Sequence, residues 1–327
     1  MSSAVTPWWR NRRLIPWLLQ AVVGLVVLVL VAFLLGNLVR NLTNAGLLLT
    51  WSWLGNPSGF EISETVIPFD ASMPYWRALM AGLMNTLRVV LFGLFGATLL
   101  GVAVGTASFS SNGLLRLLSR IYVELIRNIP LLLQLVFWYF VVFLSLPNGA
   151  AALQMPGVVL AKSGLYLSWF DSALQWQSPL LENGVWQAPL RTSVEFAALL
   201  SGLVIYSGSF IAEVVRGGIA SVPKGQWEAA TSLGFSPLLT LRRIVLPQAL
   251  RVIVPGLNTQ YISLAKNSSL AVACGFTDLY SVAETTLNQT GRAIEVMLIL
   301  LGSYLVIDLV ISALMNGLNG LVQLRER

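Results

Sequence analysis

The chain has 327 residues, of which 56% are hydrophobic and 10% are charged, whereas soluble domains carry about 25% charged residues. A chain this apolar cannot cover a water-soluble globule with polar surface, so it must contact lipid. The net charge of +6 does not indicate nucleic-acid binding, because the basic residues are scattered at the ends of apolar runs. The absence of His and the single cysteine, Cys274, exclude an internal disulfide and any His-dependent nucleophile. We therefore expect no catalytic residues and no metal site.

Six apolar segments are long enough to cross a bilayer, whose hydrocarbon core of about 30 Å needs roughly 20 helical residues. In chain order they cover residues 14–38, 80–109, 121–146, 192–215, 249–276 and 294–321. The first segment follows a short basic stretch, as in a signal peptide. Its uncharged run is too long for one, however, and ends without a small-residue cleavage site. The sequence predicts an all-α, polytopic membrane bundle of six transmembrane helices.

The distribution of Lys and Arg between the spans predicts the orientation of the chain. If the N-terminal residues 1–13 are cytoplasmic, the inner loops hold more than twice as many Lys and Arg as the outer loops. Both termini are therefore expected inside, with extracytoplasmic segments at 39–79 and 147–191. Both segments are rich in Trp, which is typical of half-helices at the membrane interface.

The longest cytoplasmic stretch, residues 216–248, has the most regular pattern in the chain. Pro223 can begin a short helix, and Gly234 stands where that helix would end in the left-handed conformation. A second short helix is expected over residues 237–245, and Pro247 then precedes the next span. This pattern predicts a helix–Gly–helix element on the cytoplasmic face.

Three residues of the first short helix, Glu228, Ala229 and Ala230, suit contact with a partner. The two alanines present almost no bulk, so another surface can approach closely, and Glu228 offers a charge to a basic partner. The alternative is an amphipathic hairpin that lies on the membrane.

A family resemblance rests on these residues and on the positions that follow them. The matching positions are Glu228, Ala229, Ala230, Gly234, Ile244, Leu246 and Pro247. At this spacing they resemble the EAA loop of ABC importer permeases, in which the loop is a coupling helix that docks into a cytoplasmic ATPase. The resemblance implies an ATPase-coupling role for Glu228, Ala229, Ala230, Gly234, Leu246 and Pro247.

Other strings resemble one branch of this family. NTLRV at 85–89, ELIRNIPLLLQL at 124–135 and FIAEVVRGGIASVPKGQWEAA at 210–230 are similar to polar amino acid permeases. TWSWL at 50–54 and EISETVIPF at 61–69 resemble the general L-amino acid permease subunit, which carries an extra N-terminal span. The resemblance implies a five-helix type I importer core within residues 80–323, preceded by one N-terminal helix.

The resemblance also implies partners. The sequence contains no G-x-x-x-x-G-K-[ST] phosphate-binding loop, so ATP hydrolysis is not expected on this chain. A cytoplasmic ABC ATPase dimer is expected to hold ATP and Mg²⁺, together with a second, paralogous permease subunit and an extracytoplasmic amino-acid-binding protein. The chain itself is expected to be a transport subunit in a bacterial inner membrane. We expect this subunit to bind no cofactor and to catalyse no reaction.

Polar residues inside the spans are candidates for the transport pathway. A charge in the hydrocarbon costs about 2.5–3.5 kcal/mol on insertion scales, so it should face a partner or a cavity. Arg88 can bind the carboxylate of an amino acid, and Asn85, Tyr206, Ser209 and Glu213 can accept hydrogen bonds from its ammonium. The alternative is hydrogen bonding between helices. The complete set of pathway candidates is Asn85, Arg88, Tyr206, Ser209, Glu213, Asn267 and Ser268.

Two further features concern helix ends and helix packing. An ion-pair group that stabilises a cytoplasmic gate can be formed by Glu124, Arg127 and Arg216. The alternative is that these side chains extend from the span ends to the membrane interface. Gly101 and Gly105 form a GxxxG spacing, which predicts close packing of the second span against another helix, with a hinge as the alternative.

An ion-gradient-driven secondary transporter of small polar solutes is the alternative function. Inverted repeats would support it, but the two halves of the sequence show no clear repeat. A channel would need rings of repeated polar residues. A membrane-embedded enzyme is disfavoured by the missing His and metal-ligand patterns.

Overall fold

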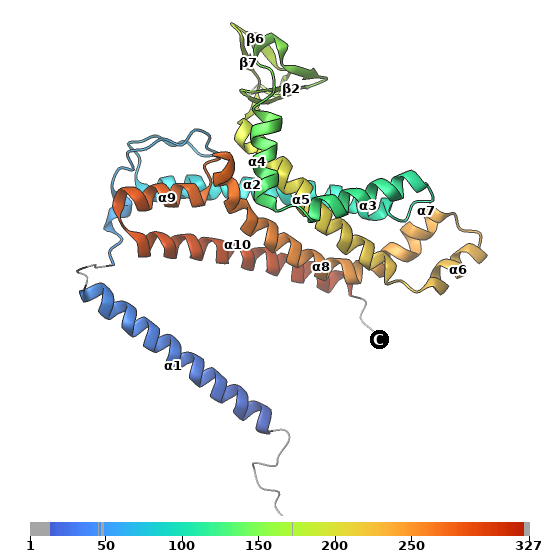
Figure 1. The fold of residues 1–327 in the computed structure, drawn as a ribbon, viewed down its shortest axis with the longest axis horizontal. Coiled ribbons are helices and arrows are strands. Elements are labelled where there is room, and N and C mark those ends of the chain that lie inside the picture. Colours follow the sequence, from blue (N-terminus) through green and yellow to red (C-terminus); the bar gives the residue numbers. More distant parts are fainter. Residues whose placement is uncertain (1–13, 45, 47–48, 172, 324–327) are drawn as a thin grey trace, which may run out of the picture. The chain divides into compact units, whose positions relative to one another are not determined.

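The computed structural model describes residues 14–44, 46, 49–171 and 173–323, and the chain divides into two compact units, residues 1–51 and 52–327 (Figure 1). In the first unit, helix α1 (Leu14–Asn44) extends the predicted span 14–38 at its C-terminal end. From Trp17 to Val39, its large apolar side chains are exposed on every side of the helix, as expected for a surface that faces lipid. The predicted cytoplasmic terminus, 1–13, lies outside the described residues.

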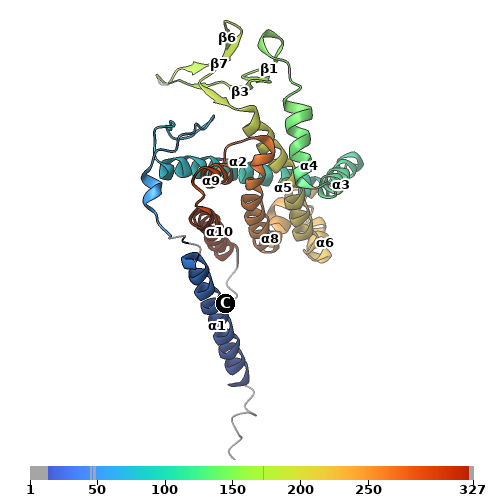
Figure 2. The same ribbon diagram turned by 60° about the vertical axis from the view of Figure 1, so that its left-hand side comes forward.

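Four long helices form the frame of the second unit. They are α2 (Tyr75–Ala107), α5 (Val194–Ala220), α8 (Leu246–Asn267) and α10 (Ala293–Val322). α2 packs along α5, and α8 packs against both α5 and α10 (Figures 1 and 2). Buried apolar residues from all four helices, among them Ala97, Ile211, Ile253 and Ile307, share one core.

Helices α2, α5 and α10 confirm the predicted spans 80–109, 192–215 and 294–321, with small shifts of their ends. Within the described chain, α1, α2, α5 and α10 are each long and apolar enough to cross a membrane. α8 is less apolar, because it carries several Gln and Asn residues, and it buries one face against its neighbours. The span predicted at 249–276 is α8 followed by a 3₁₀ segment, η6 (Ser268–Cys274), which Gly275 ends with a φ of +73°.

The span predicted at 121–146 is not one straight helix. Helix α3 (Gly113–Arg127) is followed, after a bend of 104°, by α4 (Leu131–Val136), which continues as the π-helical turn η3 (Phe137–Phe143). Taken together, the two helices are long and apolar enough for one broken span. The predicted helical content is therefore present, but its direction changes sharply halfway.

Pro130 explains the break between α3 and α4. Its ring removes a backbone donor and disfavours the helical conformation of Ile129. The side chain of Gln134 replaces part of the lost bonding by donating to the carbonyls of Ile126 and Ile129, at 2.8 and 2.9 Å. These hydrogen bonds stabilise the bend, which is therefore a specific feature of the fold.

A short helix that the sequence did not predict, α9 (Leu279–Thr290), packs on α2 and α10. It begins at Asp278, whose carboxylate accepts a hydrogen bond from the N–H of Ser281 at 2.9 Å, the usual role of an N-cap. α9 shares a core with the segment of residues 52–74, which contains the 3₁₀ turn η2 (Ser52–Gly55). Trp53 and Ile62 are buried in this core, so the segment is part of the packed unit.

The region 147–191 forms β-structure and not the interfacial half-helices that its Trp content suggested. After a 3₁₀ turn, η4 (Gly149–Ala151), a four-stranded antiparallel sheet has the order β1-β2-β3-β8, and β4–β5 and β6–β7 form two separate two-stranded hairpins. The strands are β1 (Leu153–Met155), β2 (Val158–Ala161), β3 (Gly164–Leu167), β4 (Trp169–Phe170), β5 (Trp176–Gln177), β6 (Leu180–Glu182), β7 (Val185–Gln187) and β8 (Leu190–Thr192). The fold is therefore mostly helical, with a small β-insert added to the predicted all-α bundle.

Short alternating apolar stretches separated by glycine explain the β-insert. Gly157, Gly164 and Gly184 all have positive φ, which turns between strands commonly require. Tyr166 and Trp186 fill the small core beneath the sheet. The Trp residues of this region thus contribute to the buried core as well as to the exposed surface. Composition alone could therefore not distinguish a sheet from half-helices.

The glycines of the predicted GxxxG pair lie where α2 crosses α5. A Cβ atom on Gly101 would lie 2.4 Å from Ile211 Cγ2 and 2.9 Å from the carbonyl oxygen of Gly208. A Cβ atom on Gly105 would lie 2.7 Å from the carbonyl oxygen of Ala212. Close helix packing, the first of the two interpretations, is therefore confirmed.

Candidate functional site

The loop predicted at 216–248 folds as two short helices, α6 (Lys224–Ser232) and α7 (Pro237–Thr240). A π-helical turn, η5 (Leu241–Val245), then continues α7 directly into α8. We call residues 224–245 the EAA hairpin. Its predicted helix–Gly–helix form is confirmed.

Gly234 ends α6 in the way the sequence predicts. It has a φ of +76°. The N–H of Phe235 donates to the carbonyl of Ala230 at 3.0 Å, and the N–H of Gly234 donates to the carbonyl of Thr231 at 2.9 Å. These two bonds form a Schellman motif, which satisfies carbonyls that the end of a helix otherwise leaves free.

The EAA residues do not all face outward. Glu228 and Ala229 are exposed, whereas Ala230 is completely buried. Ala230 therefore packs inside this chain, and only Ala229 can offer a partner the low bulk that the sequence suggested for both. Sequence reasoning missed Leu233 and Leu238, which are 73% and 74% exposed on either side of Gly234. These two side chains give the hairpin an apolar tip.

The base of the EAA hairpin is fixed to the helical core. Trp227 and Leu246 pack against the core shared by α2, α5, α8 and α10, and Val245 is buried in it. The side-chain amide of Gln248 in α8 also donates to Gln226 in α6 at 3.3 Å. Pro247 is exposed in the first turn of α8. A force applied to the tip would thus be transmitted to α8 and its neighbours.

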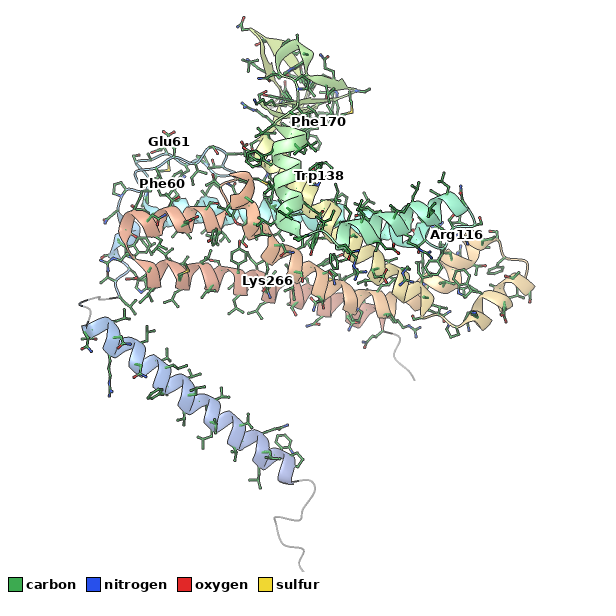
Figure 3. All side chains as sticks on the ribbon, in the orientation of Figure 1. Phe60, Glu61, Arg116, Trp138, Phe170 and Lys266 are labelled. Atoms are coloured by element: carbon green, nitrogen blue, oxygen red, sulfur yellow. The ribbon has the colours of Figure 1, made fainter. Side chains whose placement is uncertain are left out.

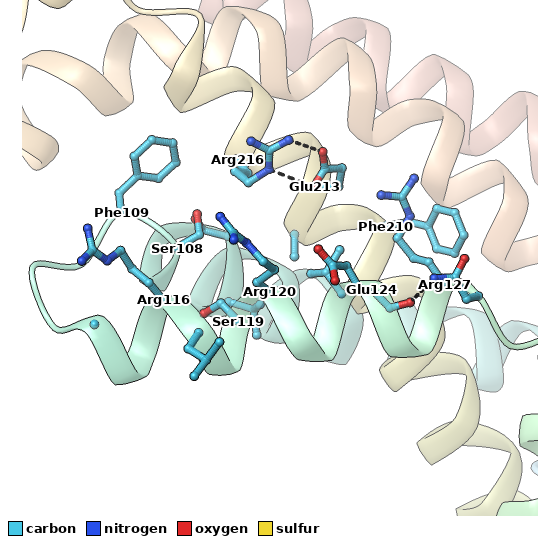
Figure 4. A pocket seen from close by; sticks show the side chains of 17 residues that line it. Ser108, Phe109, Arg116, Ser119, Arg120, Glu124, Arg127, Phe210, Glu213 and Arg216 are labelled. Atoms are coloured by element: carbon cyan, nitrogen blue, oxygen red, sulfur yellow. Dashed lines mark hydrogen bonds and ion pairs between the residues drawn. The ribbon is translucent and has the colours of Figure 1, made fainter.

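A charged hollow of about 1020 Å³ lies between the C-terminal end of α2, helix α3 and helix α5 (Figure 4). Glu213 and Arg216 form an ion pair one turn apart in α5. The guanidinium of Arg127 lies 4.9 Å from the ring centroid of Phe210. The charged side chains that line the hollow are Arg116, Arg120, Glu124, Arg127, Glu213 and Arg216.

The predicted gate residues Glu124, Arg127 and Arg216 are therefore brought together, although Arg216 pairs with Glu213 and not with Glu124. Sequence reasoning did not assign Arg116 and Arg120 to this group. Their spacing of four residues, continued by Glu124, places all three on one face of α3. This four-residue spacing was the sequence signal that could have identified Arg116 and Arg120 as members of the group.

Arg88 and Asn85 lie at the opposite end of α2, against the 52–74 segment. Arg88 forms an ion pair with Glu64, with 2.5 Å between Nη1 and Oε1, and its guanidinium lies 4.0 Å from the ring centroid of Phe196. The buried side chain of Asn85 donates to the carbonyls of Glu64 and Thr277, at 2.7 and 2.8 Å. Glu64 was not predicted, because it lies in a segment without helical or strand periodicity.

The structure does not bring Arg88 and Glu213 into one site. Arg88 stacks on Phe196 near the start of α5, and Glu213 lies about 25 Å farther along that helix at 1.5 Å per residue. The carboxylate and ammonium of one amino acid are separated by a single carbon atom, so they cannot contact both residues at once. The two residues mark different positions along the bundle.

The remaining pathway candidates make local contacts. Ser209 donates to the carbonyl of Tyr206 at 2.6 Å, and the ring of Tyr206 lies 4.9 Å from that of Phe210. Ser268 is buried and donates to the carbonyl of Ala265 at 2.7 Å. Asn267 is half-buried at the junction of α8 and η6. Among the interactions of the described residues, none joins Arg88 to Tyr206, Ser209, Asn267 or Ser268.

Residues 97–323 match the family described as binding-protein-dependent transport system inner membrane component. The putative amino-acid ABC transporter permease protein YhdX of Escherichia coli is 36% identical over 372 aligned positions, which cover 95% of each chain. The general L-amino acid transport system permease protein AapQ of Rhizobium johnstonii is 36% identical over 351 positions, which cover 89% of this chain and 87% of AapQ.

Solved structures agree in fold. A chain from the crystal structure of an amino acid ABC transporter with histidines aligns with a TM-score of 0.55 and 26% identity, covering 75% of this chain and 94% of that one. A chain of the inward-facing MetNI methionine ABC transporter aligns with a TM-score of 0.54 at 20% identity, which supports the fold alone. With its packed span helices and anchored hairpin, the chain belongs to the binding-protein-dependent transport system inner membrane components.

Proposed function

We propose that this chain is the permease subunit of an ATP-binding-cassette importer for amino acids. The observation that carries the proposal is the EAA hairpin, whose base is packed into the helical core and whose tip exposes Leu233 and Leu238. A docking surface with this construction can transmit the movement of an ATPase to the spans. The amino-acid cargo is supported by the permeases YhdX and AapQ, each 36% identical to this chain.

The partners follow from this function. A cytoplasmic ATPase dimer binds ATP and Mg²⁺ and docks on the EAA hairpin, chiefly through Glu228, Ala229 and the apolar tip. A second permease subunit, paralogous to this chain, presents its own hairpin to the other half of the dimer. An extracytoplasmic binding protein delivers the amino acid. Both termini and the hairpin face the cytoplasm, and the β-insert faces outward.

Transport is mechanical in this proposal. ATP closes the ATPase dimer and draws the two docked hairpins together, and because each hairpin base is packed against α8, the spans tilt with it. The pathway then opens outward to receive cargo, and ATP hydrolysis reverses the movement. Arg88 and Asn85 line the outer part of the pathway. Glu124, Arg127 and Arg216, with Glu213, form the inner gate around the charged hollow.

Uptake by the complete importer tests the function. The complex is purified through a tag on this chain and reconstituted in vesicles, with the binding protein outside and ATP inside. Uptake of radiolabelled amino acids should require ATP, fail with a non-hydrolysable ATP analogue and persist when a protonophore removes the proton gradient. Uptake that ignores ATP and follows the proton gradient would establish the alternative, a secondary transporter.

A further inference from the structure

The carboxylate of Glu64 is held by groups from two helices that would hold any carboxylate. One oxygen accepts from the guanidinium of Arg88 in α2, and the other accepts from the backbone N–H of Ser193 at 2.8 Å. Ser193 is the N-cap of the 27-residue helix α5, so the positive end of the helix dipole adds to this attraction. The ring of Phe196 supports the guanidinium from below.

A second observation points to a ligand with an ammonium group. Both hydrogens of the Asn85 side-chain amide are used by the carbonyls of Glu64 and Thr277. The amide oxygen of Asn85 is buried and has no hydrogen-bond partner among the described residues. A buried acceptor without a partner is costly and calls for an explanation. Asn85 and Arg88 are three residues apart and therefore share one face of α2.

The segment that covers these two residues is held at its centre by the same contacts. Residues 61–67 contain no helix or strand, and the backbone carbonyl of Glu64 is one of the groups that cover Asn85. The apolar side chains of Ile62 and Ile67 pack into the core of this unit, and the polar contacts of Glu64 fix the middle of the segment between them. Withdrawal of Glu64 would uncover a carboxylate-binding cation and a helix N-terminus together, next to the buried amide of Asn85.

We propose that Glu64 is an internal stand-in for the cargo, occupying a site that binds the α-carboxylate of an amino acid at Arg88 and Ser193 and its α-ammonium at the amide oxygen of Asn85. This inference rests on the proposed function. Exchange of the Glu64 carboxylate for that of the cargo keeps Arg88 paired throughout, so the site need not pass through a state with a bare charge in the bundle. The chemical class that fits is an α-amino acid with both groups free.

Removing the competitor tests the inference. The complete complex, without binding protein, is placed in lipid nanodiscs, and binding of tritiated L-glutamine is measured. Glu64→Gln removes the charge that competes for Arg88, so the dissociation constant for L-glutamine should fall at least tenfold. Glu61→Gln is the matched control, because Glu61 is exposed on the same segment (Figure 3) and should leave binding unchanged.

Two further arms identify the groups that bind. L-Glutamine α-amide, which lacks the carboxylate, should fail to compete in Glu64→Gln, and acetate, which lacks the ammonium, should compete more weakly than L-glutamine. Adding Arg88→Gln to Glu64→Gln should abolish the gain. If Glu64→Gln does not assemble, Glu64→Asp keeps the charge on a shorter side chain and should lower the dissociation constant several-fold.

The outcomes separate this inference from the proposed function. Normal ATP-dependent L-glutamine uptake by the unaltered importer, with no gain of binding in Glu64→Gln or Glu64→Asp, would make the ion pair a structural tether and overturn the inference alone. Equal competition by the α-amide would also overturn it. Absence of ATP-dependent uptake by the unaltered importer would overturn the proposed function, and the inference would fall with it.

Discussion

At the scale of single residues, glycine has two different roles in this chain. Gly234 has a positive φ and open space around its α-carbon, whereas Gly101 has helical geometry and lies against Ile211. The first position tolerates added volume but disfavours the backbone conformation of most L-residues. The second tolerates the conformation but has no room for a methyl group. Alanine substitutions at the two positions therefore probe conformational strain and packing separately.

Gly234→Ala should loosen the end of α6. An L-residue in the left-handed region costs roughly 1–2 kcal/mol, and nothing lies near enough to add a clash. Amide hydrogen exchange in α6 should therefore rise by about 5- to 30-fold, as measured by mass spectrometry. Gly234→Asn should show a smaller increase, because Asn tolerates this conformation. Equal exchange in all three proteins would contradict the role given to the Schellman motif.

Gly101→Ala should destabilise the contact between α2 and α5. The new methyl group would meet Ile211 and the carbonyl of Gly208, and overpacking of this kind costs about 1–3 kcal/mol. The midpoint of thermal unfolding in detergent should fall. Gly302→Ala in α10 is the matched control, because no atom lies within 4 Å of its added methyl group. An unchanged midpoint for Gly101→Ala would show that the two helices separate more easily than this packing implies.

At the scale of elements, the EAA hairpin combines a packed base with an unpacked tip. Trp227 and Leu246 contribute to the core at the base. Leu233 and Leu238 are solvent-exposed apolar residues at the tip, which is the distribution expected of a surface that a partner covers. Substitutions at the tip should therefore affect assembly without affecting the fold of this chain.

Leu238→Asp should reduce the amount of ATPase that copurifies with the permease by tenfold or more. A carboxylate in an apolar interface loses the buried contact and adds a desolvation cost. The melting temperature of the isolated permease should stay within a degree or two of the unaltered protein, because Leu238 is 74% exposed. Leu174→Asp, at an 81% exposed position in the β-insert, should leave copurification intact. Full ATPase recovery with Leu238→Asp would remove the tip from the interface.

At the scale of the whole molecule, the proposed orientation places the β-insert and the EAA hairpin on opposite faces of the membrane. Leu174→Cys and Leu233→Cys provide exposed reporters in the two regions. Cys274, the native cysteine, is completely buried and should remain silent. In intact spheroplasts, a membrane-impermeant maleimide should label Leu174→Cys and should reach Leu233→Cys only after lysis. The reverse pattern would invert the orientation.

The long spans could be predicted from sequence because length and hydropathy are local properties of the chain. The helix–Gly–helix form of the EAA hairpin could also be predicted, since Gly234 and Pro223 specify local backbone geometry. The burial of Ala230 could not, because both alanines satisfy the same pattern and only the tertiary fold decides which one faces the core.

The environment of Arg88 was beyond local reasoning for a related reason. Its partner Glu64 lies in a segment without regular structure, and the pair forms only when that segment packs across α2 and α5. The strands of the β-insert were hidden by their brevity, since two to four residues give too few positions to establish an alternation. The missed features are those that depend on contacts distant in sequence.

One consequence follows from the place where the β-insert joins the bundle. Strand β8 ends at Thr192, and the next residue is Ser193, whose N–H bonds to Glu64. A displacement of the sheet along that strand therefore reaches the carboxylate contact through a single peptide linkage, before any interhelical packing has to yield. Because only one peptide bond separates the sheet from the N–H that holds Glu64, a ligand that binds the outer surface of the sheet can strain the Glu64 contact directly.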